Sequence, residues 1–332
     1  GLDPNSEDYM AIEVNPRMSR SSALASKATG YPLAYIAAKL AIGYTLPELI
    51  NKATGVTTAC FEPALDYVVV KIPRWDFNKF PGPVDRRLGS MMKSVGEVMS
   101  VARSFEEALQ KAVRELEIGK IGLVGNPEDD IPEPIEKLKD ELANPTDERL
   151  FKIAKALKQG LSVDEIHKLS GVDRWFLYKI KNIVDMERKL KSLTFREDDE
   201  GLAKCIREAK RLGFSDKQIA KYLKVDELDV RRLRKKFGIV PSFKIIDTMA
   251  AEWPSQTNYC YLTYGDTEDD VKFEKKKKVL VLGAGCIRIG SSVEFDYCTM
   301  HTAWSMKEEG IEEVIVVNNN PETVSTDYDM SD

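Results

Sequence analysis

Apolar and polar residues alternate near the start of the chain, over residues 9–14. The apolar positions, every second residue from Met10 to Val14, fall on one side of an extended chain, and Glu13 and Asn15 fall on the other, because successive side chains of a strand point to opposite faces. The pattern predicts a short β-strand whose polar face carries a carboxylate and an amide.

The rest of the first 119 residues mixes helical and extended patterns. A helix-forming run lies between Pro32 and Gly43, which are typical of the start and the end of a helix. A dense β-branched run closes at Pro73. The predicted elements are helices at 33–42, 46–52 and 104–116 and a strand at 67–72. This part of the chain is therefore predicted to be α/β.

From about residue 121 the pattern changes to one amphipathic helix after another. A proline-rich acidic joint at 129–134 precedes them, and glycines stand where the helices are expected to stop. The predicted helices cover 135–142, 147–159, 163–170, 174–193, 201–212, 216–222 and 227–237, with Gly160, Gly171, Gly213 and Gly238 as stops. The centre of the chain is therefore predicted to be all-helical.

The last part of the chain has the pattern of a β-loop-α-β unit. A strand at 279–282 leads into a glycine loop at 283–290, a helix at 295–309 and a second strand at 314–317. The glycines are spaced Gly-x-Gly-x-x-x-x-Gly, which differs from the Gly-x-Gly-x-x-Gly fingerprint of dinucleotide-binding folds. The second strand also ends in asparagines, where an acidic ribose ligand is expected. Binding of a nicotinamide dinucleotide is therefore not favoured.

Composition narrows the class of protein. Of 332 residues, 43% are hydrophobic and 31% charged, and no apolar run is long enough to cross a membrane. The net charge of −5 argues against a nucleic-acid or anionic-membrane partner. The five cysteines include no Cys-x-x-Cys pair. No other metal-ligating residue lies near His167 or His301 at the sequence spacing of a metal site. We expect a soluble, cytoplasmic, multidomain chain with reduced thiols and no secretory signal.

The polar residues after the first predicted strand have the chemistry of phosphoryl transfer. The Glu13 carboxylate and the Asn15 amide oxygen are hard oxygen ligands of the kind that Mg²⁺ prefers. Arg17 and Arg20 lie just beyond and can hold phosphate or carbonate oxygens through forked hydrogen bonds. Positioning and charge neutralisation provide most of the catalysis in phosphoryl transfer. Spacing alone fits an edge strand with solvated arginines equally well.

The whole segment from residue 13 to 34 resembles the signature near the end of the first ATP-grasp unit of the carbamoyl phosphate synthetase large subunit. Further matches follow in the order of that family. They are Phe-Glu-Pro-Ala-Leu-Asp-Tyr-Val-Val-Val-Lys-Ile-Pro at 61–73, Met-Lys-Ser-Val-Gly-Glu-Val-Met at 92–99, Gly-Val-Asp-Arg-Trp-Phe-Leu at 171–177, Ser-Ser-Val-Glu-Phe-Asp-Tyr at 291–297 and Asn-Pro-Glu-Thr-Val-Ser-Thr-Asp-Tyr-Asp at 320–329. Because the resemblance runs from end to end, the chain is similar to the central portion of this family.

The resemblance implies a multidomain fold that combines α/β and all-α parts. Residues 1–119 would be the C-terminal part of the first ATP-grasp (carboxyphosphate) unit, a partial ATP-grasp fold. Residues 120–270 would be an all-helical oligomerisation domain, and residues 271–332 the start of the second half, a partial Rossmann-like pre-ATP-grasp domain. We therefore expect a portion of a larger polypeptide, or one piece of a split enzyme, that is inactive alone.

The resemblance also implies a reaction. The family is a ligase that makes carbamoyl phosphate from bicarbonate, ammonia and ATP, phosphorylating bicarbonate in its first half and carbamate in its second. By this resemblance Glu13 and Asn15 bind Mg²⁺ or Mn²⁺, and Arg17 and Arg20 stabilise the phosphoryl and carboxyphosphate oxygens. Related biotin carboxylases have a glutamate base after this arginine. Here the corresponding residues, 19–21, are Ser-Arg-Ser, which favours the synthetase.

The resemblance implies partners and an internal tunnel as well. A glutaminase subunit or domain commonly supplies the ammonia, and the helical domain would form homo-oligomers. The family moves carbamate through a tunnel, for which Glu97, Glu294 and Glu322 are candidate lining residues. Each of these could instead be a buried carboxylate bonded to nearby backbone. The nitrogen donor, the effector and the choice between arginine and pyrimidine biosynthesis stay open.

Two other functions fit parts of the sequence. The chain could be a non-catalytic assembly module whose helical centre oligomerises. Residues 215–236 also have the pattern of a helix-turn-helix with a basic second helix. Its DNA-binding residues would be Arg231, Arg232, Arg234, Lys235 and Lys236. A solvated charged face on packing helices explains the same pattern, and a fold alone does not confer function.

Overall fold

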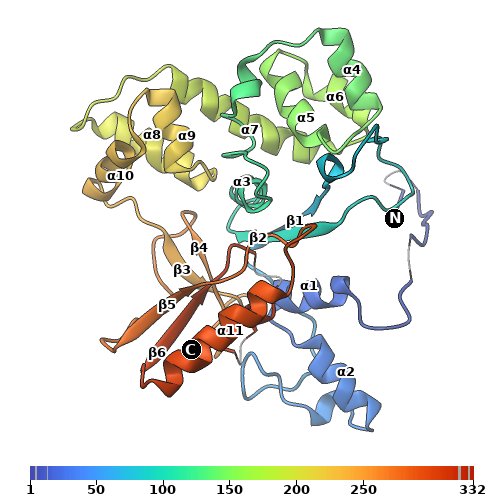
Figure 1. Ribbon diagram of the computed structural model, residues 1–332, viewed down its shortest axis with the longest axis vertical. Helices are drawn as coiled ribbons and strands as arrows, with labels where there is room; N and C mark the ends of the chain where they lie inside the picture. Colours follow the sequence, from blue (N-terminus) through green and yellow to red (C-terminus); the bar gives the residue numbers. More distant parts are fainter. Residues whose placement is uncertain (4–5, 13, 321–322, 328–329) are drawn as a thin grey trace. The chain divides into compact units, whose positions relative to one another are not determined.

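The structure is a computed structural model that describes residues 1–332 except 4–5, 13, 321–322 and 328–329, and that describes Arg20 and Ser21 by their backbone only. The described residues form helices and two-stranded sheets (Figure 1), which agrees in outline with the predicted combination of α/β and all-α parts. The chain divides into two compact units: residues 1–65 with 246–257, and residues 66–245 with 258–332.

The smaller unit carries helices α1 (Arg20–Thr29) and α2 (Leu33–Ala41). Helix α1 begins after Ser19, whose hydroxyl accepts a hydrogen bond from the backbone of Ser22, and it ends at Gly30 in the left-handed conformation. The helices pack on a small apolar core of Ile36, Leu49 and Ala59, with Tyr31 and Leu46 beside it.

Two elements predicted for this unit are wrong. In the described part of residues 9–14 there is no strand; Tyr9 makes an isolated bridge with Leu2, and Met10 is 75% exposed. The alternating apolar side chains have no neighbouring strand there to cover them. The helix predicted at 46–52 shortens to the 3-10 turn η1 (Leu46–Glu48), because the next residues fold back and Ile50 bridges to Thr58.

The larger unit begins with an antiparallel hairpin. Strands β1 (Val68–Arg74) and β2 (Gly96–Ala102) pair along their whole length, with Arg74 opposite Gly96. Pro73 lies within β1, where it is tolerated because each strand of a two-stranded sheet has an open edge. The 3-10 turn η2 (Phe77–Lys79) follows β1, and helix α3 (Phe105–Glu115) packs on the hairpin.

Helices fill the centre of the larger unit, as predicted. They are α4 (Ile135–Ala143), α5 (Arg149–Lys158), α6 (Val163–Ser170), α7 (Arg174–Lys191), α8 (Glu200–Arg211), α9 (Asp216–Leu223) and α10 (Glu227–Lys236), preceded by the 3-10 turn η3 (Pro127–Asp130). Every helix boundary lies within two residues of its predicted position. Local capping explains this agreement: Ser162, Asp173 and Ser215 accept hydrogen bonds from the first turns of α6, α7 and α9.

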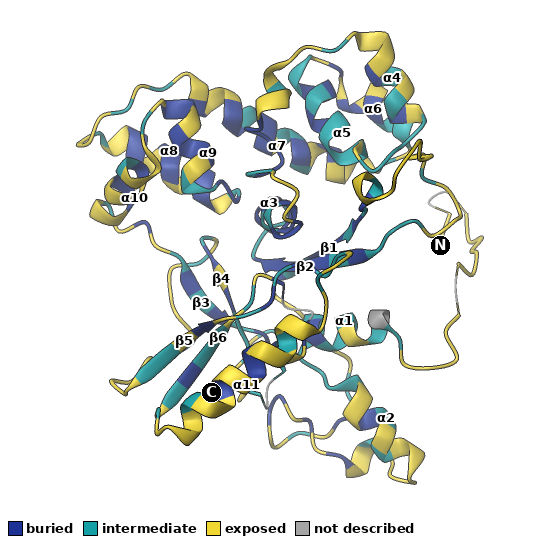
Figure 2. Ribbon diagram, in the orientation of Figure 1, coloured by how far each residue is buried: buried dark blue, intermediate teal, exposed yellow. Residues whose placement is uncertain are grey.

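One apolar core joins the hairpin to these helices. It runs from Val70 and Val98 through α3 and the helical segment to Leu233, and it includes Cys286 near the end of the chain. Buried residues are frequent on α3, α8 and α9, whereas α11 (Glu294–Glu308) exposes most of its surface (Figure 2). This core contains residues on both sides of residue 119, which lies within the larger unit. The predicted division into domains at that residue stays a prediction.

Two further strand pairs complete the larger unit. Strands β3 (Ser242–Ile245) and β4 (Cys260–Thr263) pair antiparallel. Strands β5 (Lys278–Leu282) and β6 (Glu313–Val317) pair in parallel and are joined by α11, which confirms the β-loop-α-β prediction. The 3-10 turn η4 (Val324–Thr326) follows β6.

Candidate functional site

The predicted metal and anion residues lie in the smaller unit. Glu13 lies outside the described residues, and the side chain of Arg20 is not described. Asn15 and Arg17 are exposed, and the Arg17 guanidinium donates a 2.9 Å hydrogen bond to the neighbouring carbonyl of Met18. Arg20 is the first residue of α1, directly after the Ser19 cap. The two side chains that can be described are thus accessible from solvent, and the site itself stays a prediction.

Among the tunnel candidates, Glu97 lies on β2 opposite Pro73. Its carboxylate forms an ion pair with Lys71 of β1, and its side chain is 14% exposed. Its backbone carbonyl accepts a 3.5 Å hydrogen bond from the Asn320 side chain. Glu97 is therefore partly buried where β2 meets the segment that follows β6.

Glu294 is the first residue of α11 and is exposed. Its carboxylate accepts a 2.9 Å hydrogen bond from the backbone nitrogen of Ser292, and backbone hydrogen bonds hold the pKa of the Glu294 carboxyl below its usual range. This contact is local capping at the start of a helix. Glu322 lies outside the described residues. The tunnel roles of these glutamates stay predictions.

The structure brings together residues to which the sequence analysis assigned no role in a site. After β6, the Asn318 side chain accepts a 2.7 Å hydrogen bond from the Ala284 nitrogen in the glycine loop. Asn320, which is fully buried, accepts a 3.4 Å hydrogen bond from the Met99 nitrogen on β2. Asp296 of α11 accepts hydrogen bonds from the backbone of Val324 and Ser325, at 2.6 and 3.1 Å. The run of asparagines at the carboxyl end of a parallel strand was the available signal, since ligands and polar contacts gather there in α/β sheets.

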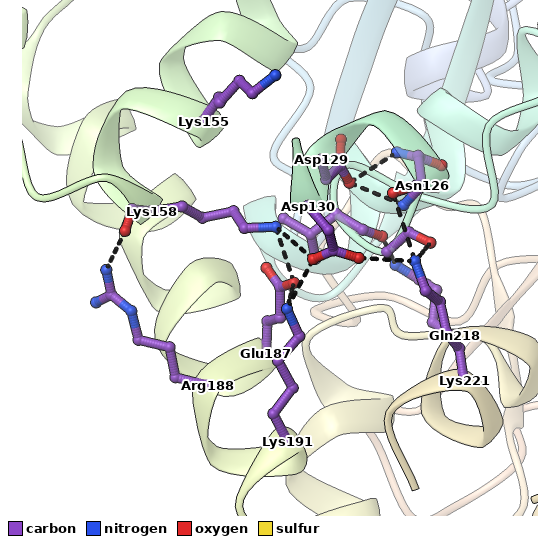
Figure 3. Close-up of polar contacts among 12 residues, drawn as sticks. Asn126, Asp129, Asp130, Lys155, Lys158, Glu187, Arg188, Lys191, Gln218 and Lys221 are labelled. Carbon is purple, nitrogen blue, oxygen red and sulfur yellow. Dashed lines mark hydrogen bonds and ion pairs between the residues drawn. The ribbon is translucent and has the colours of Figure 1, made fainter. Parts of the chain in front are cut away.

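A network of charged residues holds the helical segment together (Figure 3). Asp130, at the end of η3, faces lysines from three helices. They are Lys158 of α5 at 3.7 Å, Lys191 of α7 at 3.0 Å and Lys221 of α9 at 3.2 Å. Glu187 of α7 is buried and pairs with the first two of these lysines, at 3.0 and 2.9 Å. The network therefore joins α5, α7 and α9 to the joint that precedes the helices.

The predicted basic helix α10 uses part of its charge within the protein. Arg234 is only 6% exposed, and its guanidinium bonds to Asp216 at 2.7 Å and to the carbonyl of Ile239. Arg232 pairs with Asp229, and Lys236 pairs with Asp198. These contacts support helix packing as the role of this charge, in place of phosphate binding.

Two kinds of feature are absent from the described residues. No group of three or more histidine, cysteine, aspartate or glutamate residues is placed to hold a metal ion. Within the described part of the chain, the helices are too short or too polar to cross a bilayer.

Comparison with known families gives three matches in order along the chain. Residues 1–49 match the carbamoyl-phosphate synthase L chain ATP binding domain. Residues 97–238 match the carbamoyl-phosphate synthetase large chain oligomerisation domain, and residues 275–332 match the carbamoyl phosphate synthase preATP-grasp domain. The chain belongs to the carbamoyl phosphate synthetase large chain family.

Relatives of this family match the whole chain. The carbamoyl phosphate synthase large chain of Thermoanaerobacter pseudethanolicus is 53% identical over 336 residues, which cover 100% of this chain and 30% of the relative. The multifunctional protein pyrABCN of Emericella nidulans is 53% identical over 331 residues, and this chain covers 14% of it. The carbamoyl phosphate synthase arginine-specific large chain of Cutaneotrichosporon cutaneum is 52% identical, with 27% covered. The chain thus spans about a third or less of the length of these relatives.

Proposed function

We propose that this chain is the central portion of a carbamoyl phosphate synthetase large chain, which makes carbamoyl phosphate from bicarbonate, ammonia and ATP. The observation that carries the proposal is the order of the three family matches, ATP-binding, oligomerisation and preATP-grasp, along one chain. In this proposal residues 1–119 end the first ATP-grasp unit, residues 120–270 form the oligomerisation domain and residues 271–332 begin the second half.

The residues proposed for the first reaction have suitable chemistry. A carboxylate at Glu13 and the amide oxygen of Asn15 form a hard oxygen donor set that suits Mg²⁺ or Mn²⁺. When bound, such a cation neutralises phosphate charge. The guanidinium groups of Arg17 and Arg20 would hold the oxygens of the transferred phosphoryl group and of carboxyphosphate. The exposure of Asn15 and Arg17 supports this role, because both side chains can meet a ligand.

The proposal includes partners. A glutaminase subunit or domain would supply ammonia, and the helical segment would join copies of the chain. The match of residues 97–238 to an oligomerisation domain supports the second of these. Cytoplasmic location and a place in arginine or pyrimidine biosynthesis are part of the same proposal.

A second candidate function, for the isolated chain, is that of a non-catalytic assembly module. The continuous core of the larger unit, with the helical network around Asp130 and Glu187, favours a stable scaffold. The two candidates agree if the chain needs the rest of the synthetase for turnover.

Assays of the chain and of a complete synthetase carrying it test the proposal. We expect the complete enzyme to make carbamoyl phosphate, and the isolated chain to self-associate in sedimentation without bicarbonate-dependent ATPase activity. In the complete enzyme, Asn15→Ala or Arg17→Ala should lower this ATPase activity about 100-fold. Arg232→Ala, at an exposed arginine of α10, is the matched control and should have no effect. A complete enzyme that makes no carbamoyl phosphate would refute the proposal.

A further inference from the structure

The glycine loop of residues 283–290 packs against other parts of the protein and does not form an open phosphate-binding loop. A Cβ added at Gly285 would collide with the carboxylate of Glu117, and one added at Gly283 would collide with the Asn318 side chain. On the other side, a Cβ at Gly96 of β2 would collide with the carbonyl of Ile287. The glycines therefore permit a close approach between this loop, the β1–β2 hairpin and the end of α3.

Asp76, just after β1, is bonded to this loop. It is 1% exposed, and its two carboxylate oxygens accept hydrogen bonds from the Arg74 Nε at 2.9 Å and from the Ile289 backbone nitrogen at 3.0 Å. Burial opposes ionisation of this carboxyl, but the hydrogen bonds from Ile289 and Arg74 and the Arg74 charge outweigh it and hold the pKa of Asp76 below its usual range. Asp76 is thus a buried, charged carboxylate, and each of its two oxygens accepts a hydrogen bond, one from Arg74 and one from Ile289.

Arg74 connects this carboxylate to the rest of the unit. It is 7% exposed, and its guanidinium also donates to the Leu116 carbonyl at the end of α3. Its backbone carbonyl accepts a 2.9 Å hydrogen bond from the Val95 nitrogen. A second link, the ion pair between Arg288 and Glu117, crosses the same junction. We call Arg74, Asp76 and the Ile289 N–H the loop anchor.

The loop anchor lies beside the predicted tunnel residues without including them. Arg74 follows Pro73, which is paired with Glu97 across the hairpin. On the other side, the loop leads into α11, whose first residue is Glu294. A shift of the loop relative to the hairpin would therefore move these two glutamates relative to each other.

We propose that Asp76 is a positioning residue that holds the 283–290 loop of the second half against the β1–β2 hairpin of the first, and so keeps the path for carbamate between them continuous. The role in carbamate transfer rests on the proposed function. The attachment of the loop by Asp76 does not.

Hydrogen exchange of the 332-residue chain tests the attachment. Asp76→Asn should speed exchange of the Ile289 amide about tenfold or more, because a charged acceptor is lost, and should leave the β1–β2 amides protected. Asp147→Asn is the matched control, since it weakens the 2.8 Å contact of Arg86 with Asp147 elsewhere in the unit and should not affect Ile289. If Asp76→Asn unfolds the hairpin, the double variant Arg74→Met, Asp76→Asn is used in its place, because it leaves no buried arginine without its carboxylate partner. The same faster exchange of the Ile289 amide is expected in it. Unchanged exchange at Ile289 would overturn the attachment.

Activity of the complete enzyme tests the role in transfer. Asp76→Asn should leave bicarbonate-dependent ATP hydrolysis and the reverse step, ATP formation from ADP and carbamoyl phosphate, within about twofold of wild type. It should raise the ATP consumed per carbamoyl phosphate about twofold or more, since carbamate is lost between the halves. Simple destabilisation would lower all activities in parallel and would overturn the positioning role. A wild-type enzyme without carbamoyl phosphate synthesis would refute the proposed function and leave the exchange result standing.

Discussion

The hydroxyl of Thr263 on β4 donates a 2.6 Å hydrogen bond to the carboxylate of Glu107 on α3, across 156 residues of sequence. The other carboxylate oxygen of Glu107 accepts a 2.8 Å hydrogen bond from the backbone nitrogen of Tyr264. Glu107 is 2% exposed. This single carboxylate therefore fastens the β3–β4 pair to α3.

Loss of this carboxylate should destabilise the protein. Glu107→Ala leaves the buried Thr263 hydroxyl and the partly buried Tyr264 N–H without this acceptor, so we expect the free energy of unfolding to fall by about 2–4 kcal/mol. Urea denaturation measures this, and Glu136→Ala, at a glutamate whose side chain is 86% exposed, should cost less than about 0.5 kcal/mol. Equal effects of the two variants would show that the contact contributes little.

Gly213 should resist substitution more strongly than a comparable glycine. It has a φ of 83°, and an added Cβ would lie 2.8 Å from the Glu107 Cα and 3.0 Å from the Glu107 carbonyl oxygen. Gly213→Ala should cost about 2–4 kcal/mol, because backbone must move as well as adopt a strained φ. Gly238 has a φ of 63° with open space around it, so Gly238→Ala should cost only about 1 kcal/mol in the same denaturation assay. A similar cost at both sites would mean that only φ matters.

Lys210 should make stability depend on pH. Burial lowers its pKa from 10.5 to about 8, although Asp216, at 3.0 Å, favours the charged form. The folded protein releases this proton near pH 8, and the unfolded chain holds it until about pH 10.5. Burial of the charged Lys210 destabilises the fold below pH 8, and this cost falls as the pH rises from 8 to 10.5. The free energy of unfolding of wild type relative to Lys210→Met should therefore rise by about 1–3 kcal/mol between pH 7.5 and pH 10.

Urea denaturation across this pH range separates Lys210 from other groups that titrate. Lys217→Met, at an exposed lysine of α9, is the control and should follow the wild-type pH dependence. A wild-type curve parallel to that of Lys210→Met would show that the lysine keeps an ordinary pKa.

The charged network of the helical segment should respond unequally to the loss of its two carboxylates. The Glu187 side chain is 2% exposed and that of Asp130 is 48% exposed. Glu187→Ala leaves Lys158 and Lys191 without their buried partner and should cost about 2–4 kcal/mol. Asp130→Ala should cost less than about 1 kcal/mol, because exposed ion pairs contribute little. Thermal unfolding measures both, and the reverse order would show that the burial of Glu187 does not set the size of its contribution.

Glu97 gives a prediction that belongs to the proposed synthetase. Glu97→Gln in the complete enzyme removes the charge that pairs with Lys71 and should uncouple ATP hydrolysis from carbamoyl phosphate formation, as should Glu322→Gln. The ratio of ADP released to carbamoyl phosphate formed measures this coupling, with Glu136→Gln as control. Unchanged coupling would remove both glutamates from the tunnel.

Local chemistry explains why the helices were predictable. Ser162, Ser215 and Gly171 fix helix ends through contacts within a few residues, so the sequence pattern gave boundaries close to those observed. The β5–α11–β6 unit was likewise readable from a buried-type strand, a loop and a helix. Strands β3 and β4 were not, because each is only four residues long and the pair is held to α3 by Glu107, which bonds to Thr263 at the end of β4 and is far away in the sequence.

The candidate site was less predictable for the same reason. The family signature singled out Asn15, Arg17 and Glu97, but nothing near Asp76 in the sequence indicates that it binds the backbone of Ile289, 213 residues later. The contact of Asn320 with Glu97 spans 223 residues. Such contacts depend on how separate elements pack, and a pattern read along one chain does not contain that information.

The apolar core that includes Val70, Leu233 and Cys286 also limits how a gene for this protein can be divided. All buried members of this core except Cys286 lie between Val70 and Ile239, so fission within that range would divide the core and expose apolar side chains on both products. Both pieces would then depend on reassembly to avoid aggregation. Viable natural breaks in such genes should therefore fall outside this stretch.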